Sequence, residues 1–165
     1  MNTVKEVVKV GIADMNIATR GQSIRTSGLG SCVGVVLYDE VIHLAGMVHV
    51  MLPSSSLANG SSLNLAKFAD TGVRELANLL SKQGGRISRM KAKIAGGAQM
   101  FQFTSGSELM RIGPRNIESV KQALDSLGIP LLSEDVGGRN GRTIEFHLDS
   151  FLLNVRTVNM GVRDI

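Results

Sequence analysis

The segment most informative about the fold is SGLGSCVGVVLYD, residues 27–39. It is a glycine-rich turn followed directly by an apolar, β-branched segment. It holds Cys32, the only cysteine of the 165 residues, and three glycines lie within four positions of that thiol. Because glycine lacks a Cβ and tolerates positive φ, such a turn can bring backbone N–H groups close to another group. A thiol presented there is open to substrate, and the N–H groups can stabilise an oxyanion. Free cysteine is also among the most buried residue types, so the stretch alone leaves a structural and a catalytic interpretation open.

Composition indicates a soluble globular protein with a single domain over residues 1–165. A chain of this length can bury a substantial core. Hydrophobic residues make up 43% and charged residues 19% of the chain, but tryptophan is absent and aromatic residues reach only 4%. We therefore expect a core built from Leu, Val, Ile, Met and Ala side chains.

Charge and cysteine usage narrow the possible partners and cofactors. A single cysteine excludes an internal disulfide framework and a multi-cysteine zinc site, and it favours a reducing compartment. Residues 1–7 lack the apolar segment of a signal peptide, and the longest apolar run, 44–52, is too short to cross a bilayer. The net charge of +4 comes from scattered Lys and Arg without interleaved aromatics, so nucleic acid is not indicated. We expect a cytoplasmic protein without membrane insertion.

Hydrophobic periodicity predicts an α+β fold of mixed β-sheets with two main helices packed on them. Apolar residues recur at helical spacing from Asn64 to the Gly84-Gly85 pair, and again from Gly113 to Gly128. Strand-like segments come in clusters rather than alternating strictly with helices, which argues against a doubly wound parallel fold. The predicted strands are 4–12, 23–27, 33–38, 43–52, 90–95, 131–136, 142–148 and 152–158.

A nucleophilic cysteine needs a base, and the chain offers three histidines. His147 lies in a late strand, and His43 begins its strand near solvent. His49 lies deep in the longest apolar run, where a polar ring must find a hydrogen-bond partner. In a hairpin centred on residues 39–41, positions 32 and 49 oppose each other to within a residue. The spacing therefore predicts a dyad of Cys32 and His49.

The imidazole of such a dyad needs a third group to orient it. Thr26, just before the glycine-rich turn, is a candidate through its hydroxyl, and the nearby alternatives are Ser27, Ser31 and Asp39. Spacing does not choose among these four side chains.

Two other motifs fit the glycine-rich turn less well. Residues 30–34 have the form G-x-C-x-G of a nucleophile elbow, but that motif needs a helix after the nucleophile and a histidine late in the chain. The β-branched residues that follow Cys32 predict a strand instead. A phosphate-binding loop needs a following Lys-Ser or Lys-Thr pair and a helix N-terminus, whereas the next element is predicted to be a strand. We therefore reject both motifs for this stretch.

Six stretches of the chain, in order and over nearly its whole length, resemble the CheD family of chemoreceptor glutamine deamidases of bacterial and archaeal chemotaxis. They are TxGLGSCV at 26–33, AGMVHVMLP at 45–53, KFAD at 67–70, KIAGGA at 93–98, IGxRN at 112–116 and EDxGG at 134–138. The resemblance implies a single deamidase domain, with a fold similar to that of bacterial toxin deamidases.

The resemblance implies a specific catalytic role for each of three residues. Cys32 would be the nucleophile, His49 the base, and Thr26 the third member, which orients the histidine. The enzyme would be a protein-glutamine glutaminase, an amidohydrolase that converts selected glutamines of methyl-accepting chemotaxis receptors to glutamate through a thioester and releases ammonia. Its substrates would lie on the helical cytoplasmic region of the receptors, and no metal or organic cofactor is implied. Members of the family also bind the CheC phosphatase.

Several expectations accompany this interpretation. Backbone N–H groups near Ser31 and Cys32 are expected to hold the oxyanion, and the loop 54–62 is a candidate gate beside the site. Arg139 and Arg142, on a glycine-rich turn, are candidate docking residues for acidic receptor helices, and ordinary solvated charges are the alternative interpretation. The alternative function is a binding regulator of receptors and of the CheC phosphatase, with catalysis secondary or lost.

Overall fold

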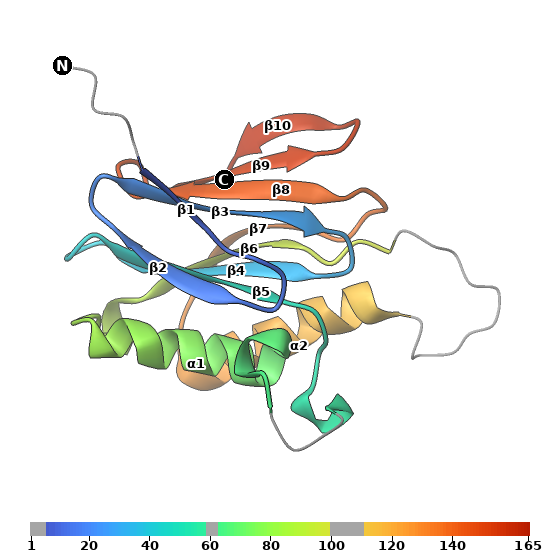
Figure 1. Cartoon of the computed structure of the whole chain (residues 1–165), viewed down its shortest axis with the longest axis horizontal. Helices are drawn as coiled ribbons and strands as arrows, with labels where there is room; N and C mark the ends of the chain where they lie inside the picture. Colours follow the sequence, from blue (N-terminus) through green and yellow to red (C-terminus); the bar gives the residue numbers. More distant parts are fainter. Residues whose placement is uncertain (1–5, 59–62, 100–110) are drawn as a thin grey trace.

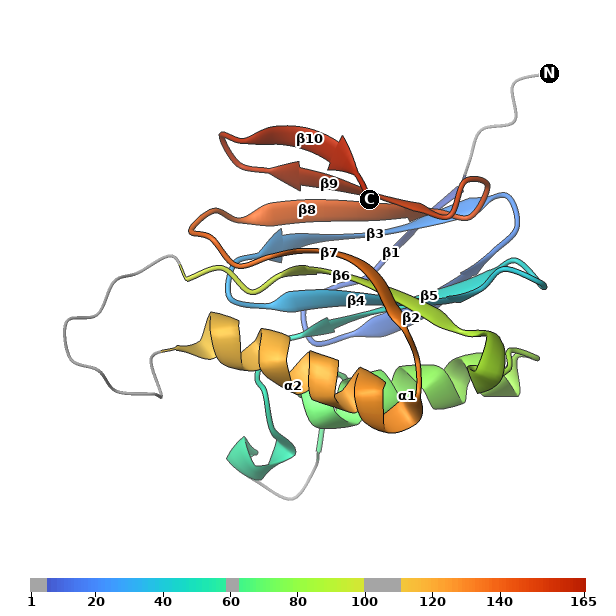
Figure 2. The same ribbon diagram turned by 180° about the vertical axis from the view of Figure 1, so that it is seen from behind.

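Two β-sheets and a layer of two helices are stacked on one another in the computed structural model, which describes residues 6–58, 63–99 and 111–165 (Figure 1). The middle layer is a five-stranded sheet that packs against the outer sheet on one face and against the helices on the other, as the view from behind also shows (Figure 2). The α+β class predicted from the sequence is confirmed.

The outer sheet has the strand order β1-β3-β8-β9-β10. Its strands are Glu6–Lys9 (β1), Gln22–Leu29 (β3), Arg142–His147 (β8), Leu152–Thr157 (β9) and Gly161–Asp164 (β10). Strands β1 and β3 pair in parallel, and the other pairs are antiparallel. This sheet is therefore mixed, as predicted.

The middle sheet has the strand order β2-β5-β4-β6-β7. Its strands are Met15–Thr19 (β2), Leu44–Val50 (β5), Val33–Asp39 (β4), Lys91–Gly96 (β6) and Leu131–Val136 (β7). It is also mixed, because β6 and β7 pair in parallel while the remaining pairs are antiparallel.

Strands β4 and β5 are buried on both faces, which explains why their sequences are almost continuously apolar. Val33, Val35 and Leu37 of β4 join the core beneath the helices. The alternate residues Val36 and Tyr38 join the core between the two sheets. The glycine-rich turn therefore leads into the strand at the centre of the molecule.

The helix layer consists of Ala69–Lys82 (α1) and Ile112–Leu127 (α2). The predicted start of the first helix near Asn64 is wrong. The side chain of Asn64 instead caps a short 3₁₀ turn, Leu65–Lys67, and the backbone on both sides of Phe68 pairs with Leu52. This pairing holds Phe68 in an extended conformation, so the α-helix begins one residue later.

Two strands were not predicted, and several boundaries differ from the predicted ones. Strand β2 has only weak alternation, and β10 is a short edge strand that is exposed along its length. The predicted strand 4–12 is a strand only over 6–9, and its residues 4 and 5 lie outside the described residues. Residues 59–62 of the expected gating loop 54–62 also lie outside the described residues. Ser55–Leu57 of that loop form a 3₁₀ turn. No helix among the described residues is both long and apolar enough to span a membrane.

Candidate active site

Cys32 lies in the turn from β3 to β4, one residue before β4 begins. Its thiol is free and half-buried, and it packs against the core between the two sheets. Burial raises the pKa of the Cys32 thiol, although a hydrogen bond from the backbone N–H of Cys32 itself partly offsets this effect. The resting group is therefore a neutral thiol at neutral pH, and it needs a base before it can attack.

The hairpin of β4 and β5 brings His49 to the same side of the middle sheet. His49 pairs with Gly34, and this register continued by two residues places Cys32 diagonally across from His49. The predicted register is wrong by two residues, because the hairpin loop spans 40–43 instead of a tight turn at 39–41. A shift of two residues leaves side chains on the same face, so Cys32 and His49 still share a face, and their action as a dyad stays a prediction.

Gly34 is needed where the two sheets approach one another next to His49. A Cβ built at Gly34 would lie 2.6 Å from Cδ1 of Ile144 and 3.3 Å from Cδ1 of Leu29, both on the outer sheet. The missing side chain lets the outer sheet close over the His49 side of the hairpin.

Thr26 of β3 reaches across from the outer sheet to the His49 ring. Its hydroxyl oxygen lies 2.8 Å from Nδ1 of His49 and 2.7 Å from the carbonyl oxygen of Val10. A carbonyl only accepts, so the single hydroxyl hydrogen of Thr26 is donated to Val10 and Nδ1–H of His49 donates to Thr26. This arrangement selects the Nδ1–H tautomer and leaves the lone pair on Nε2.

The His49 ring is fully buried, and burial lowers its pKa to about 4. Its Nε2 has no hydrogen-bond partner among the described residues. The ring is thus a neutral imidazole with an unused acceptor nitrogen, which is the state that a general base requires.

Among the described residues, no hydrogen bond joins the side chain of Ser27, Ser31 or Asp39 to the His49 ring. Asp39 lies at the opposite end of β4. Burial alone would raise the pKa of its carboxyl group. Hydrogen bonds from the Arg89 side chain and from the backbone N–H groups of Arg86 and Val41 outweigh this effect, so the pKa is lowered. Ser27 is exposed. Of the four hydroxyl and carboxyl groups considered, the structure brings Thr26 to the ring.

The remaining histidines lie away from the cysteine. His43, in the loop at the far end of the hairpin, accepts a hydrogen bond from Nη2 of Arg20 at 3.0 Å. His147 lies at the end of β8, with Nε2 3.7 Å from Oε2 of Glu145.

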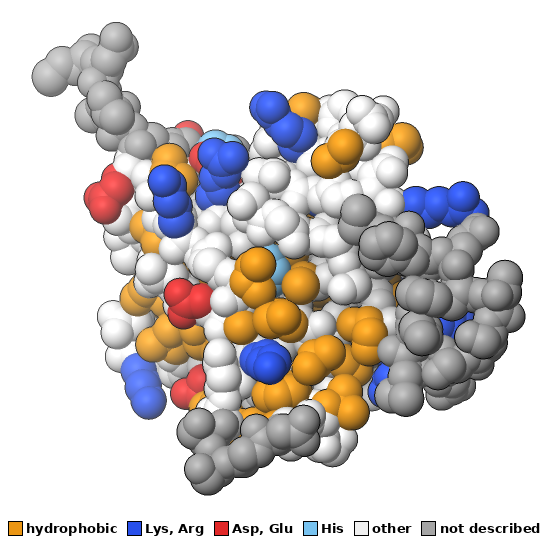
Figure 3. Space-filling view, turned by 45° about the vertical axis from the view of Figure 1, so that its right-hand side comes forward, with side chains coloured by type: hydrophobic (Ala, Val, Ile, Leu, Met, Phe, Trp, Pro, Cys, Tyr) orange, Lys and Arg blue, Asp and Glu red, His pale blue; other side chains and the backbone are white. Residues whose placement is uncertain are grey.

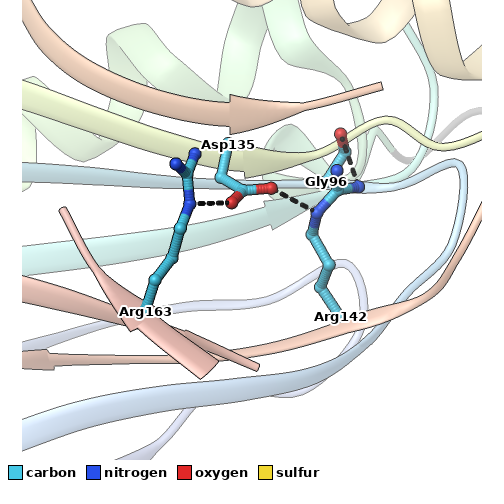
Figure 4. A network of polar contacts seen from close by, with 4 residues as sticks. All are labelled: Gly96, Asp135, Arg142 and Arg163. Atoms are coloured by element: carbon cyan, nitrogen blue, oxygen red, sulfur yellow. Dashed lines mark hydrogen bonds and ion pairs between the residues drawn. The ribbon is translucent and has the colours of Figure 1, made fainter. Parts of the chain in front are cut away.

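The interpretation of Arg142 as a docking residue is wrong. Its side chain is buried, and Nε binds Oδ1 of Asp135 at 2.8 Å while Nη1 donates to the carbonyl oxygen of Gly96. The other oxygen of Asp135 binds Nε of Arg163 at 2.6 Å (Figure 4). Arg142 therefore ties the two sheets together near the end of β6. Arg139 is exposed and keeps its interpretation as a docking candidate.

Backbone contacts from the end of β6 hold the cysteine turn in place. The N–H of Gly97 donates to the carbonyl of Cys32, and the N–H of Ala98 donates to the carbonyl of Gly30, both at 2.8 Å. The turn is thus anchored through its carbonyl groups.

Asn116, from α2, is a site residue to which sequence reasoning assigned no role. It is fully buried, and its amide nitrogen donates to the carbonyls of Ser31 and Met51. A signal was available, because Asn116 precedes Val120 and Leu124 at four-residue spacing on the buried stripe of the helix. A polar residue on such a stripe must be hydrogen-bonded.

The surface at this end of the molecule is partly apolar. Figure 3, turned so that the end with the β3–β4 turn comes forward, shows hydrophobic side chains gathered in its lower half. Basic side chains lie among and above them, and the acidic side chains in this view lie to their left.

Comparison with known proteins identifies relatives of this chain. Residues 51–157 match the family model described as CheD chemotactic sensory transduction. The chemoreceptor glutamine deamidase CheD of Halalkalibacterium halodurans is 54% identical over 160 residues, which cover 97% of this chain and 99% of that protein. The protein of the same name from Bacillus subtilis is 53% identical over 159 residues, which cover 96% of each chain.

One solved structure that resembles this chain is more distant in sequence. The Neisseria meningitidis protein NMB0706 aligns with 81% of this chain and 64% of its own, at 9% identity and a TM-score of 0.49. A similarity this low supports no inference about the site.

Proposed function

The chain belongs to the CheD family, and from that premise we propose that it deamidates glutamine side chains of chemoreceptors to glutamate in chemotactic adaptation. It would act as a protein-glutamine glutaminase through one domain over residues 1–165, located in the cytoplasm. The relatives named chemoreceptor glutamine deamidase support the substrate class. The observation that carries the chemistry is the His49 ring, which Thr26 holds with Nε2 unprotonated on the side of the sheet that bears Cys32.

The first half of the reaction forms a thioester. Nε2 of His49 accepts the thiol proton of Cys32, and the sulfur attacks the carbon of the glutamine carboxamide. The negative charge passes to the carboxamide oxygen, to which the backbone N–H of Cys32 can donate. Collapse of this intermediate breaks the C–N bond, and the imidazolium of His49 gives its proton to the departing ammonia.

The second half returns the enzyme to its starting state. His49 takes a proton from water, the hydroxide oxygen attacks the thioester carbon, and the C–S bond breaks. The products are a glutamic acid side chain, which loses its carboxyl proton to solvent and becomes glutamate, and a Cys32 thiolate, which recovers its proton from His49. Each proton that His49 accepts or gives moves through Nε2, because Nδ1 stays hydrogen-bonded to Thr26 throughout.

The surface chemistry supports a helical, acidic substrate. The net charge of +4 favours association with acidic segments, and the hydrophobic side chains near the site suit the apolar stripe of an amphipathic helix (Figure 3). The helical cytoplasmic region of methyl-accepting receptors has this character. A CheC-type phosphatase is the second partner we propose.

Mass spectrometry of receptor cytoplasmic fragments tests the proposal. Fragments incubated with the purified protein should show glutamine-to-glutamate conversion at specific positions, and Cys32→Ala and His49→Gln variants should lose it. Binding of the fragments to each variant, measured in parallel, separates catalysis from recognition. Equal conversion by the wild type and Cys32→Ala would overturn the thioester mechanism. Binding without conversion by any form, wild type included, would instead favour the binding regulator.

A further inference from the structure

Two backbone carbonyls that flank the candidate dyad point at the same side chain. Ser31, one residue before Cys32, and Met51, two residues after His49, both direct their carbonyl oxygens at Nδ2 of Asn116. The distances are 2.9 Å to Ser31 and 3.0 Å to Met51. Carbonyls only accept, so these contacts fix the orientation of the amide and use both of its N–H hydrogens.

This contact lies just beyond the end of the β4–β5 ladder. The ladder between β4 and β5 ends at the pair Val33 and Val50, and beyond it the N–H of Met51 donates to Lys67 instead. Two acceptors cannot bind each other directly, so the gap between Ser31 and Met51 needs a group with two donors. The primary amide of Asn116 meets this requirement.

Asn116 is itself held on a firmly seated part of α2. A Cβ at Gly113, one turn earlier, would lie 2.4 Å from the carbonyl oxygen of Ala98, so the helix packs directly on the backbone after β6. Ser119, one turn later, donates to the carbonyl of Pro53 at 2.6 Å. The position of the amide is therefore set by the helix backbone.

The remaining polar atom of Asn116 has no partner. Oδ1 is buried and has no hydrogen-bond partner among the described residues. An apolar side chain of the same size would avoid this unsatisfied acceptor, but it would leave the carbonyls of Ser31 and Met51 without a donor from this position. Asn116 therefore keeps both donors in place at the cost of one unsatisfied acceptor.

We propose that Asn116 is a positioning residue that fixes the separation of Cys32 and His49 by bridging the carbonyls of Ser31 and Met51. This proposal rests on the proposed function of the Cys32–His49 pair. Asn116 acts on the backbone that carries both groups, and it need not contact the substrate. A displacement of about 1 Å in such a pair can lower the rate by roughly 10²-fold.

The test uses variants that keep the size of the side chain and remove its donors. Asn116→Leu and Asn116→Asp should lower kcat for receptor fragments by roughly 10²-fold while KM stays within about twofold. Leu124→Ala, a core truncation on the same helix away from the site, controls for lost stability. Ser126→Ala, which removes the hydrogen bond from the Ser126 hydroxyl to the carbonyl of Ala123, controls for the loss of one hydrogen bond on α2. Each control should keep kcat within about twofold when rates are corrected for the folded fraction.

A second measurement needs no glutamine substrate. The rate at which iodoacetamide alkylates Cys32 at neutral pH should fall in Asn116→Leu toward the rate of a His49→Gln variant. Partial unfolding would act in the opposite direction, because it exposes the half-buried thiol. In the His49→Gln background, Asn116→Leu should have no further effect on alkylation, since its effect passes through the same pair.

The outcomes separate this proposal from the proposed function. Wild-type deamidation with an unchanged kcat in Asn116→Leu would overturn the positioning role and leave the enzyme assignment intact. Additive effects of the His49 and Asn116 changes on alkylation would also overturn it. Non-additive alkylation in a protein that deamidates no receptor fragment would support the positioning role while the proposed function failed.

Discussion

The His49 ring is oriented by two hydrogen bonds in series, from its Nδ1–H to Thr26 and from the Thr26 hydroxyl to the carbonyl of Val10. Thr26→Val keeps the shape of the side chain and removes the hydroxyl, which leaves Nδ1 without a partner. We expect kcat on receptor fragments to fall about tenfold or more, because one neutral hydrogen bond is worth about 1 kcal/mol and the tautomer is no longer fixed. Thr26→Ser should restore most of the rate. A wild-type kcat in Thr26→Val would contradict the orienting role.

Burial of His49 also predicts a pH dependence of stability. Its pKa is about 4 in the folded protein and about 6.5 in the unfolded chain, so between these values the unfolded chain binds more protons. The free energy of unfolding should therefore be fully retained above about pH 6.5 and fall as the pH drops toward 4. Between pH 7 and pH 5 the contribution of His49 is about 1–2 kcal/mol.

Urea unfolding at pH 7 and pH 5 measures this contribution. Wild type should lose more stability over this interval than His49→Gln, because the two proteins share every other titrating group. An equal loss in both would show that His49 titrates alike in the folded and unfolded states.

At the level of residues, the sequence identified catalytic candidates where few residue types can perform the chemistry. A lone cysteine among glycines and a histidine in an apolar strand are conspicuous, and both lie where the fold brings them to one face. Thr26 was one of four candidates, and only the packing of β3 against β5 across the two sheets distinguishes it. The carbonyl of Val10 could not be predicted, because a backbone acceptor leaves no mark in the side-chain sequence.

The β4–β5 hairpin shows why elements were easier to predict than their register. Continuous apolar runs identified both strands, but the loop 40–43 contains His43 at φ +50°, a conformation that non-glycine residues seldom adopt. Loop length sets the register, so the two-residue error followed from that loop. The start of α1 was missed for a similar reason, since pairing of the backbone around Phe68 with Leu52 is a tertiary contact.

The end of β6 supports the cysteine turn, and Gly96 is the residue that allows the close approach. Gly96 has φ +114°, and a Cβ there would lie 2.3 Å from the carbonyl oxygen of Cys32. We expect Gly96→Ala to lower the free energy of unfolding by about 2–4 kcal/mol, from backbone strain together with this overlap. It should also lower kcat, because the turn must move.

Gly21→Ala is the matched control for this substitution. Gly21 also has positive φ, at +87°, but a Cβ there meets nothing within 4 Å. It should therefore show only the strain component, and its kcat should be unchanged. If urea unfolding gave the same loss for both variants, the contact with the Cys32 carbonyl would not be the cause.

The stacking of two sheets and a helix layer was only partly predictable. The class followed from clustered strands and two amphipathic segments, but alternation of apolar residues does not say which sheet a strand joins. Strands β2 and β3 are adjacent in sequence and lie in different sheets. The charged contact between the sheets was also hidden, because Asp135 was predicted only as part of a strand and Arg142 was interpreted as a docking residue or a solvated charge.

Asp135 joins the two sheets through two arginines that differ in solvent exposure (Figure 4). The Arg142 side chain is 6% exposed and that of Arg163 is 62% exposed, so only Arg142 depends on Asp135 for a buried countercharge. Asp135→Ala should therefore lower the free energy of unfolding by about 3 kcal/mol or more, while Arg163→Ala should cost under about 1 kcal/mol. Asp135→Leu combined with Arg142→Leu should recover most of the loss, since the double variant leaves no unpaired buried charge. Urea unfolding of the wild type and the three variants tests this prediction. Equal losses of the free energy of unfolding in Asp135→Ala and Arg163→Ala would mean that solvent screens both ion pairs and that apolar packing alone holds the sheets together.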